Sequence, residues 1–375
     1  MPGSRDLRFD SLRGLMLVFM TVNHLPTELR TVTDGSIGLF SSAEGFVFLS
    51  GILAGYVYIR RLWKGGEAGL KAAAVKRTKT IYAWHIASFL GCLVVVQATE
   101  KVLGFCSQNS PQLFYSNPFL ALGLGLTLLH QPGLLDLLPM YCVFVMLLPY
   151  VLPALEAGRR KWVLAASVGL WAVGQVCPAI DGAPIYPVHL GTFNLFAWQL
   201  LFVVGMVIGH ARARSDSNLV PVRPWLIAGA LGVVVFSFGI RHYQWQTPWA
   251  DAFFGISLNK PNLGLLRLAD FGCVAYLVAV IGGQAPALLT WRPLAYLGQA
   301  SIAVVAAQSV LVMFLLEFPA LFETFWSRTA IVASTIAFLF ASAALYHRHQ
   351  RLAKAGIVVS IDSRQPSTPA LDRAA

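Results

Sequence analysis

The chain has 375 residues, of which 57% are hydrophobic and only 12% are charged. Its mean hydropathy of +0.65 is higher than that of ordinary soluble domains, so the composition excludes a soluble globular enzyme and indicates an integral membrane protein. The formal net charge of +11 needs no nucleic acid partner, because membrane topology and anionic lipid explain most of it. The apolar runs are roughly 17–25 residues long, which suits helices across a core of about 30 Å and not barrel strands. The predicted fold class is all-α.

Hydropathy predicts about ten transmembrane helices in a single domain over residues 1–350. The expected spans are 12–28, 38–59, 80–99, 134–154, 162–178, 192–211, 223–240, 262–283, 294–316 and 328–346. A shorter apolar piece at 117–130, which ends at a Gln-Pro-Gly sequence, is expected to be a half-helix or an interfacial helix. The last fifteen or so residues are polar and include proline, so residues 351–375 are predicted to be a disordered cytoplasmic tail.

Basic residues concentrate in alternate connections between the predicted spans. The rich connections lie at 60–79, 159–161, 212–223, 292 and from 348 onward, while the others hold only isolated cations. By the positive-inside rule, the rich connections and both termini are predicted to be cytoplasmic.

The first predicted span carries an arginine and a histidine separated by ten residues, Arg13 and His24. At 100° and 1.5 Å per residue, the two side chains share one helix face and lie about 16 Å apart along the axis. Asp10 stands where an N-cap is expected, and Pro26 is expected to end or kink the helix just past the imidazole. His24 is either an interfacial anchor or a functional group, since ionisable residues within a membrane are candidates for function.

The second predicted span enters from the same side and begins with the sequence SSAEGFVFLSG, Ser41 to Gly51. This start places Glu44 at a depth comparable with that of His24. A carboxylate beside an imidazole orients it and raises its basicity, as in a general-base arrangement. Glu44 is therefore a candidate partner of His24.

The chain resembles the transmembrane acyltransferase (acyltransferase-3-like) superfamily, through the arginine–histidine spacing and the FVFLSG sequence that follows. More closely, it resembles the OpgC-type family, which succinylates osmoregulated periplasmic glucans in Gram-negative bacteria. The resemblance covers about residues 6–350. The sequences that carry it are RFDSLRGLMLVFMTVNHLP, AEGFVFLSGILAGYVY and QPGLLDLLP.

The resemblance implies a multi-pass enzyme of the bacterial inner membrane that moves an acyl group from cytoplasmic acyl-CoA, expected to be succinyl-CoA, to a hydroxyl of a periplasmic glucan. His24 then corresponds to the catalytic histidine of the family. It acts as general base in direct transfer or forms a transient acyl-histidine, two alternatives that stay open. Glucan-synthesis proteins are candidate partners. Coenzyme phosphates call for cytoplasmic cations, and the candidates are Arg8, Arg13, Lys76, Arg77 and Lys79.

Two further charged residues are candidates for the site. Asp136, in QPGLLDLLP, either positions the base or caps the next helix. Arg267 lies just inside a predicted span with Asp270 three positions later. It is either a clamp for the succinyl carboxylate or for the oxyanion of the tetrahedral intermediate, or one half of an internal ion pair with Asp270.

Each of the remaining polar residues has a structural and a functional interpretation. Gln299, Ser301 and Gln308 are expected to make interhelical hydrogen bonds. The aromatic segment 241–255 is equally suited to stacking on glucose rings and to an interfacial belt, and His189 is similarly ambiguous. His85 and His130 are expected to be structural.

The five cysteines show no metal-ligand spacing, and no metal site is predicted. Cys106 and Cys177 both fall on the predicted outer side. Whether they pair is left open.

Two other functions compete with the acyltransferase. A transporter of a glucan, an acyl compound or a small anion would line its path with His24, Glu44 and Arg267. A purely structural partner of a glucan-synthesis assembly would not need His24 at all.

Overall fold

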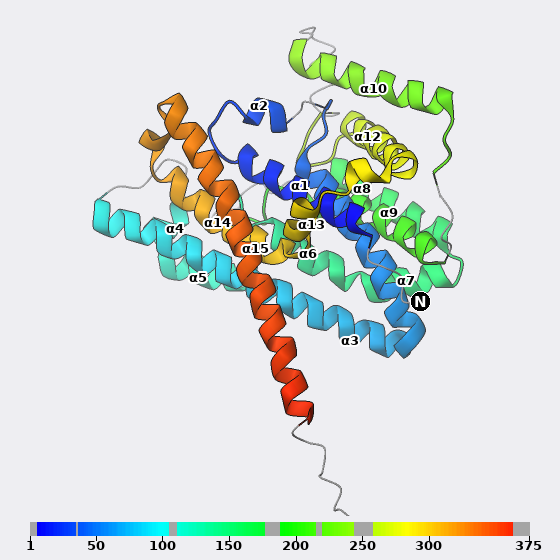
Figure 1. Cartoon of the computed structure of the whole chain (residues 1–375), viewed down its shortest axis with the longest axis horizontal. Coiled ribbons are helices and arrows are strands. Elements are labelled where there is room, and N and C mark those ends of the chain that lie inside the picture. The colour runs from blue at the N-terminus through cyan, green and yellow to red at the C-terminus, as the bar shows by residue number, and fades with distance from the viewer. Residues whose placement is uncertain are drawn as a thin grey trace, which may run out of the picture.

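The computed structural model describes residues 6–34, 37–104, 111–176, 188–214, 220–243 and 258–362. The helices are α1 (Leu7–Asn23), α2 (Arg30–Thr33), α3 (Ser42–Leu103), α4 (Gln112–Ser116), α5 (Pro118–Leu126), α6 (Leu137–Met146), α7 (Leu148–Glu156), α8 (Arg160–Val176), α9 (Leu195–Arg214), α10 (Pro224–Tyr243), α12 (Leu265–Gln284), α13 (Arg292–Gln299), α14 (Ser301–Leu316) and α15 (Phe325–Asp362). Short 3₁₀ turns, Pro286–Leu289 and Pro319–Phe322, follow α12 and α14. Within the described ranges there is no strand, and one isolated bridge joins His130 to His189. The all-α prediction is confirmed (Figure 1).

Among the residues that the structure describes, five helices are long and apolar enough to cross a membrane, and up to seven spans result if two bent helix pairs each count as one. The architecture therefore suits a multi-pass membrane protein. Every predicted apolar segment contains a helix, but the number of about ten spans and the side of each terminus stay predictions. Helix α15 continues past residue 350 to Asp362. The lower end of this helix projects beyond the rest of the bundle (Figure 1).

Helix α3 consists of two helices that meet at Gly66, where the backbone is not helical. Gly66 has φ 61° and ψ −166°, a conformation that glycine adopts without a steric cost. The second arm then runs back from this turn (Figure 1). The basic connection at 60–79 is helical on both sides of this one residue. The turn allows Arg60, from the first arm, and Arg77, from the second, to reach the same cavity.

The first arm of α3 packs closely against α9 through glycines on both helices. A β-carbon at Gly51 or Gly55 would collide with the backbone of α9, and one at Gly205 or Gly209 would collide with the backbone of α3. Each pair has the four-residue spacing of small-residue helix interfaces in membranes. This packing holds the first arm of α3 rigidly beside α9.

Two predicted spans are bent. The span predicted at 294–316 breaks into α13 and α14 with an angle of 84°, and the span predicted at 134–154 bends by 43° between α6 and α7. Helix α13 lies against α1 so closely that the backbones meet at Gly14 and Gly298. Helix α13 is therefore packed against α1, and α14 turns away from α13 by 84° into the bundle core.

Helix α1 begins earlier than the sequence indicates. The N-cap is Asp6, whose carboxylate accepts a hydrogen bond from the backbone N–H of Arg8. The predicted cap, Asp10, instead lies in the first turn and is buried. The prediction was wrong because the helix continues one turn toward the N-terminus, where Asp6 satisfies the free N–H groups equally well.

The polar residues predicted to join helices do so. Ser301 accepts a hydrogen bond from Arg13, Gln308 accepts one from Thr21, and Gln299 donates one to Asp10 at 3.4 Å. All three bonds tie α13 and α14 to α1. They position α1, which carries the candidate base near its end.

Candidate active site

Two cavities enter the helical bundle. The first, called the histidine cavity, has a volume of about 660 Å³ and is lined by residues that include His24, Asp136, His189, Lys260 and Gln308. The second, called the arginine cavity, has a volume of about 960 Å³. Its basic lining residues are Arg8, Arg13, Arg60, Arg77 and Arg212.

His24 is the C-cap residue of α1, and its backbone N–H donates to the carbonyl of Thr21 at 3.2 Å. The helix ends at Asn23, two residues before the Leu25–Pro26 bond, in keeping with the inability of Pro26 to continue it. The His24 side chain is exposed to the histidine cavity, so a substrate hydroxyl in the cavity has direct access to the imidazole.

Glu44 and Arg267 form a buried ion pair with each other. Arg267 Nε donates to Glu44, and the second carboxylate oxygen of Glu44 accepts the backbone N–H of Ser41 at 2.5 Å. Their exposed fractions are 0% and 4%, and neither belongs to the lining of the histidine cavity. Within the described residues no hydrogen bond joins Glu44 to His24. The pairing of Arg267 with Asp270 was also wrong, because Asp270 accepts the N–H of Leu39 at 2.8 Å.

Asp136 occupies the N-cap position of α6, but its side chain does not cap that helix. Its carboxylate accepts the backbone N–H of Thr192 at 3.0 Å, from the segment that precedes α9. His189 lies in the same segment, and its Nδ1 atom is hydrogen-bonded to the carbonyl oxygen of Gln131 at 2.9 Å. His130 faces His189 with ring centroids 6.4 Å apart. Asp136 is therefore grouped with these two histidines, which were not predicted as site residues.

Lys260 is the lysine of the histidine cavity, and sequence reasoning did not select it. It lies in the loop before α12. Burial lowers the pKa of Lys260, while the negative charges of Glu44 and Asp34 oppose this effect. Its presence disfavours a second positive charge in the same cavity, which favours the neutral imidazole that a base requires.

The arginine cavity holds several cations around a single acid of its lining, Asp6. Arg8 Nη2 and Arg212 Nη2 both donate to Asp6, at 2.7 and 2.8 Å. Burial works to raise the pKa of Asp6, but the hydrogen bonds from Arg8 and the charges of Arg8 and Arg212 outweigh it and hold that pKa below its usual value. Asp6 thus positions two guanidinium groups at the cavity without neutralising the whole set.

The other arginines of this cavity differ in their surroundings. Arg60 donates to the hydroxyl of Tyr56 at 2.6 Å, and Arg13 lies over the ring of Phe46 at 5.2 Å. Arg77 is half-buried and has no carboxylate within ion-pair distance among the residues that the structure describes. An arginine held in a cavity without an acid is suited to bind an anionic ligand.

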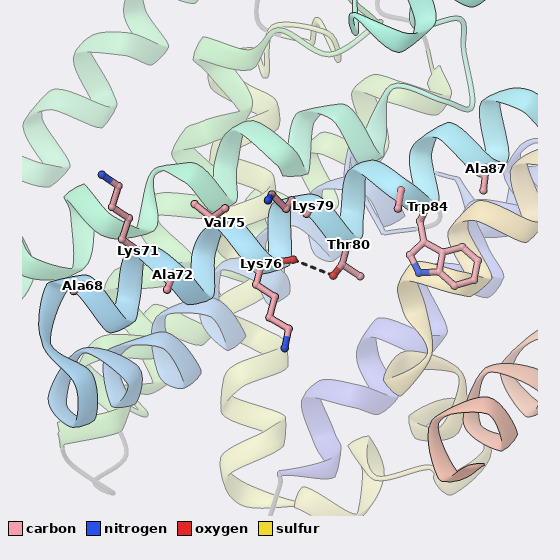
Figure 2. Close-up of a pocket in the computed structure, with 10 residues that line it drawn as sticks. Ala68, Lys71, Ala72, Val75, Lys76, Lys79, Thr80, Trp84 and Ala87 are labelled. Carbon is pink, nitrogen blue, oxygen red and sulfur yellow. Dashed lines mark hydrogen bonds between the residues drawn. The ribbon is translucent and has the colours of Figure 1, made fainter. Parts of the chain in front are cut away.

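Lys76 and Lys79 lie elsewhere. They are exposed and line an open groove on the second arm of α3 together with Lys71 and Trp84. Figure 2 shows Lys76 pointing away from Lys71 and Lys79. The structure therefore brings Arg8, Arg13 and Arg77 together in the arginine cavity and separates both lysines from them.

The two cavities meet at Val305 on α14, which lines both of them. Neighbouring positions on two other helices face opposite cavities. Leu137 lines the histidine cavity and Leu138 the arginine cavity, and Ala43 and Phe46 divide in the same way. A wall that includes Val305, Leu137, Leu138, Ala43 and Phe46 thus separates the imidazole side from the guanidinium side.

Some predictions fall outside the described residues. These are the pairing of Cys106 with Cys177 and most of the aromatic segment 241–255. The described cysteines, Cys92, Cys142 and Cys273, are not in disulfides. In the described ranges no group of three or more His, Cys, Asp or Glu residues is arranged to hold a metal ion.

The helices and the paired cavities define a helical, multi-pass membrane protein with a cationic pocket and an imidazole pocket on either side of one wall. A model of the OpgC protein family matches residues 5–351, so the chain belongs to this family. Membership indicates a role in the modification of osmoregulated periplasmic glucans, as a transferase that acts on glucans. No curated protein and no solved structure matches the chain.

Proposed function

We propose that this protein is a bacterial inner-membrane O-acyltransferase that transfers an acyl group, expected to be succinyl, from cytoplasmic acyl-CoA to a hydroxyl of a periplasmic glucan. The observation that supports the proposal most strongly is the pair of cavities that meet at Val305. One cavity is built for an anionic coenzyme, and the other presents an imidazole. In this arrangement neither the coenzyme nor the glucan crosses the membrane.

The donor is proposed to bind in the arginine cavity. Phosphates favour guanidinium groups, which donate two parallel hydrogen bonds, and five arginines line this cavity. Arg77 is the candidate for the first contact, since no acid competes for it among the described residues. Arg60 and Arg212 join Arg8, Arg13 and Arg77 in this role, and Lys76 and Lys79 do not line the cavity.

His24 is proposed as the general base. Its imidazole takes the proton of the glucan hydroxyl while the oxygen attacks the thioester carbonyl. The tetrahedral intermediate then collapses, the carbon–sulfur bond breaks, and the coenzyme thiolate accepts the proton from the imidazolium. The products are a glucan ester and free coenzyme A. The pantetheine arm is a thin chain that fits the offset of about 16 Å along α1 between Arg13 and His24.

The alternative to direct transfer is a covalent acyl-histidine. A protein that retains labelled acyl group without acceptor would support it. Rates that depend on donor and acceptor together in a ternary complex would support direct transfer.

The test is mass spectrometry of periplasmic glucans from cells that lack the endogenous enzyme. The cells are complemented with the wild type, with His24→Ala, or with His349→Ala, at equal membrane expression. His349 is an exposed histidine on α15 and serves as the matched control. Wild type and His349→Ala should add one succinyl mass per event, and His24→Ala should add nothing. Equal modification by all three forms would remove His24 from the mechanism.

Two cavities that share a lining residue would also suit a transporter, and one measurement separates it from the enzyme. Acyl-CoA should raise the thermal stability of an acyltransferase, because a ligand that binds only the folded state stabilises it. A transporter should respond to free glucan or succinate instead.

A further inference from the structure

The inference concerns Lys260 in the histidine cavity, and it rests on the proposed function. An acyl-CoA is linear, with its phosphates at one end, the thioester sulfur in between and the acyl chain at the other end. If the phosphates lie in the arginine cavity and the thioester lies at the wall near Val305, the far end of the acyl chain enters the histidine cavity first. The groups that line this cavity therefore meet the end of the acyl chain.

Lys260 is the only lysine or arginine among the described residues that line the histidine cavity. Arg267, the cation predicted for this task, does not line the cavity and is held by Glu44. In contrast, the Lys260 ammonium has no ion pair within 4.0 Å in the part of the chain that the structure describes. The cavity thus offers one lysine cation without an acid bound to it.

The loop that carries Lys260 is held by side chains of α8 and of the start of α9. Trp198 Nε1 donates to the carbonyl of Pro261 at 2.9 Å, and Trp171 Nε1 donates to the carbonyl of Leu263 at 3.0 Å. Gln175 Nε2 donates to the carbonyl of Asn262 at 2.5 Å. Three successive carbonyls are therefore anchored just after Lys260. A loop anchored in this way presents its lysine in one place, which suits recognition.

The backbone of Leu263 is a second feature that defines the shape of this loop. It has φ 53°, a left-handed conformation that costs energy for a branched residue. The indole of Trp171 holds its carbonyl there. The strained turn brings the loop directly from the cavity into α12.

We propose that Lys260 binds a carboxylate at the far end of the acyl chain and thereby selects donors that are half-thioesters of dicarboxylic acids. An ammonium that is partly withdrawn from water gains from pairing with an anion, whereas an uncharged acyl end leaves it unpaired. Glu44 and Asp34 lie near enough to support the positive charge without forming an ion pair with it. Lys260 is a specificity-determining residue in this role, and His24 remains the base.

The experiment measures kcat/KM of the purified full-length protein with a glucan acceptor and two donors, succinyl-CoA and acetyl-CoA. The variants are Lys260→Gln and Lys260→Arg, with Lys101→Gln as control. Lys101 is an exposed lysine that lines neither cavity. Lys260→Gln should lose about 10- to 100-fold with succinyl-CoA and less than about threefold with acetyl-CoA, as expected for one hydrogen bond to a charged group. Lys260→Arg should retain most succinyl transfer, and Lys101→Gln should equal the wild type.

Charge reversal provides a second test that a misfolded variant cannot imitate. Lys260→Glu should prefer β-alanyl-CoA, in which an ammonium replaces the terminal carboxylate, over succinyl-CoA. A wild type that transfers succinyl while Lys260→Gln loses both donors equally, or neither, would overturn the assignment of Lys260. A wild type that transfers no acyl group from any donor would instead overturn the proposed function, and this inference with it.

Discussion

The two cavities differ in how their charged groups are partnered. In the arginine cavity, Arg8 and Arg212 share Asp6, Arg60 is held by Tyr56, and Arg77 has no acid among the described residues. The guanidinium-bearing side chains all line the arginine cavity. The cavity is arranged for a ligand that brings several negative charges.

Two ion pairs outside the lining of the histidine cavity hold charged side chains away from its space. Glu44 and Arg267 are paired and buried, and Asp34 and Arg241 pair at 3.2 Å. His24 and Lys260 line the cavity, together with Asp136, which is bonded to Thr192. On the proposed function, the arginine cavity binds the phosphates of the donor and the histidine cavity holds the reacting groups, so variants on the two sides should fail in different ways.

The largest effect is expected from removing the base. His24→Ala should lower the rate of acyl transfer by about 10²–10⁴-fold, the usual contribution of a positioned acid–base group. The KM for the donor should stay nearly unchanged, because the proposed coenzyme contacts lie in the other cavity. Initial rates of the purified protein, with His349→Ala as control, measure this. A rise in donor KM with unchanged turnover would contradict the separation of roles.

The next largest effect is expected from the buried ion pair of Glu44 with Arg267. Glu44→Gln leaves the buried Arg267 without its acid, and the free energy of unfolding should fall by about 3–5 kcal/mol. Thermal or denaturant unfolding in the same detergent measures the loss. The double variant Glu44→Gln with Arg267→Gln should recover part of it, since no lone charge then remains buried.

The same variant also tests the role first predicted for Glu44. If Glu44→Gln folds as stably as the wild type but loses turnover, Glu44 orients His24, and the structural interpretation fails.

An intermediate effect is expected at the wall. Val305→Phe adds bulk where the cavities meet, and crowding of this kind costs about 1–3 kcal/mol. Transfer should fall by roughly 10- to 100-fold, while binding of a non-reactive acyl-CoA analogue to the arginine cavity should persist. Val305→Ile serves as the size control. Loss of analogue binding in parallel with transfer would show that the donor does not approach the wall in the way proposed.

The smallest effect distinguishes the arginine cavity from the groove on α3. Arg77→Gln should raise the donor KM by about tenfold, the loss of one charge-assisted hydrogen bond, with turnover retained. Lys79→Gln should change it by less than about twofold, since the charge of an exposed side chain that does not line the cavity is screened by salt. Equal effects of both variants would place the phosphates on the groove.

Much of the helical framework could be predicted because apolar run length is a local property of the chain. The segments at 192–211 and 223–240 correspond to α9 and α10 within a few residues. The breaks could not be predicted in the same way. The 84° bend between α13 and α14 is accompanied by close contact of α13 with α1 at Gly14, and nothing in the local pattern of 294–316 encodes that partner.

Within the candidate site, the sequence determined which residues lie far apart along α1, because helix geometry fixes the offset between Arg13 and His24. It also determined the membrane class and the family, through composition and motif. Only the tertiary structure decided that Arg267 is held by Glu44, 223 positions away, and that Lys260 reaches the cavity. The physical reason is that a long-range ion pair depends on which helices pack together, and helix packing depends on side chains from the whole bundle rather than on any one segment.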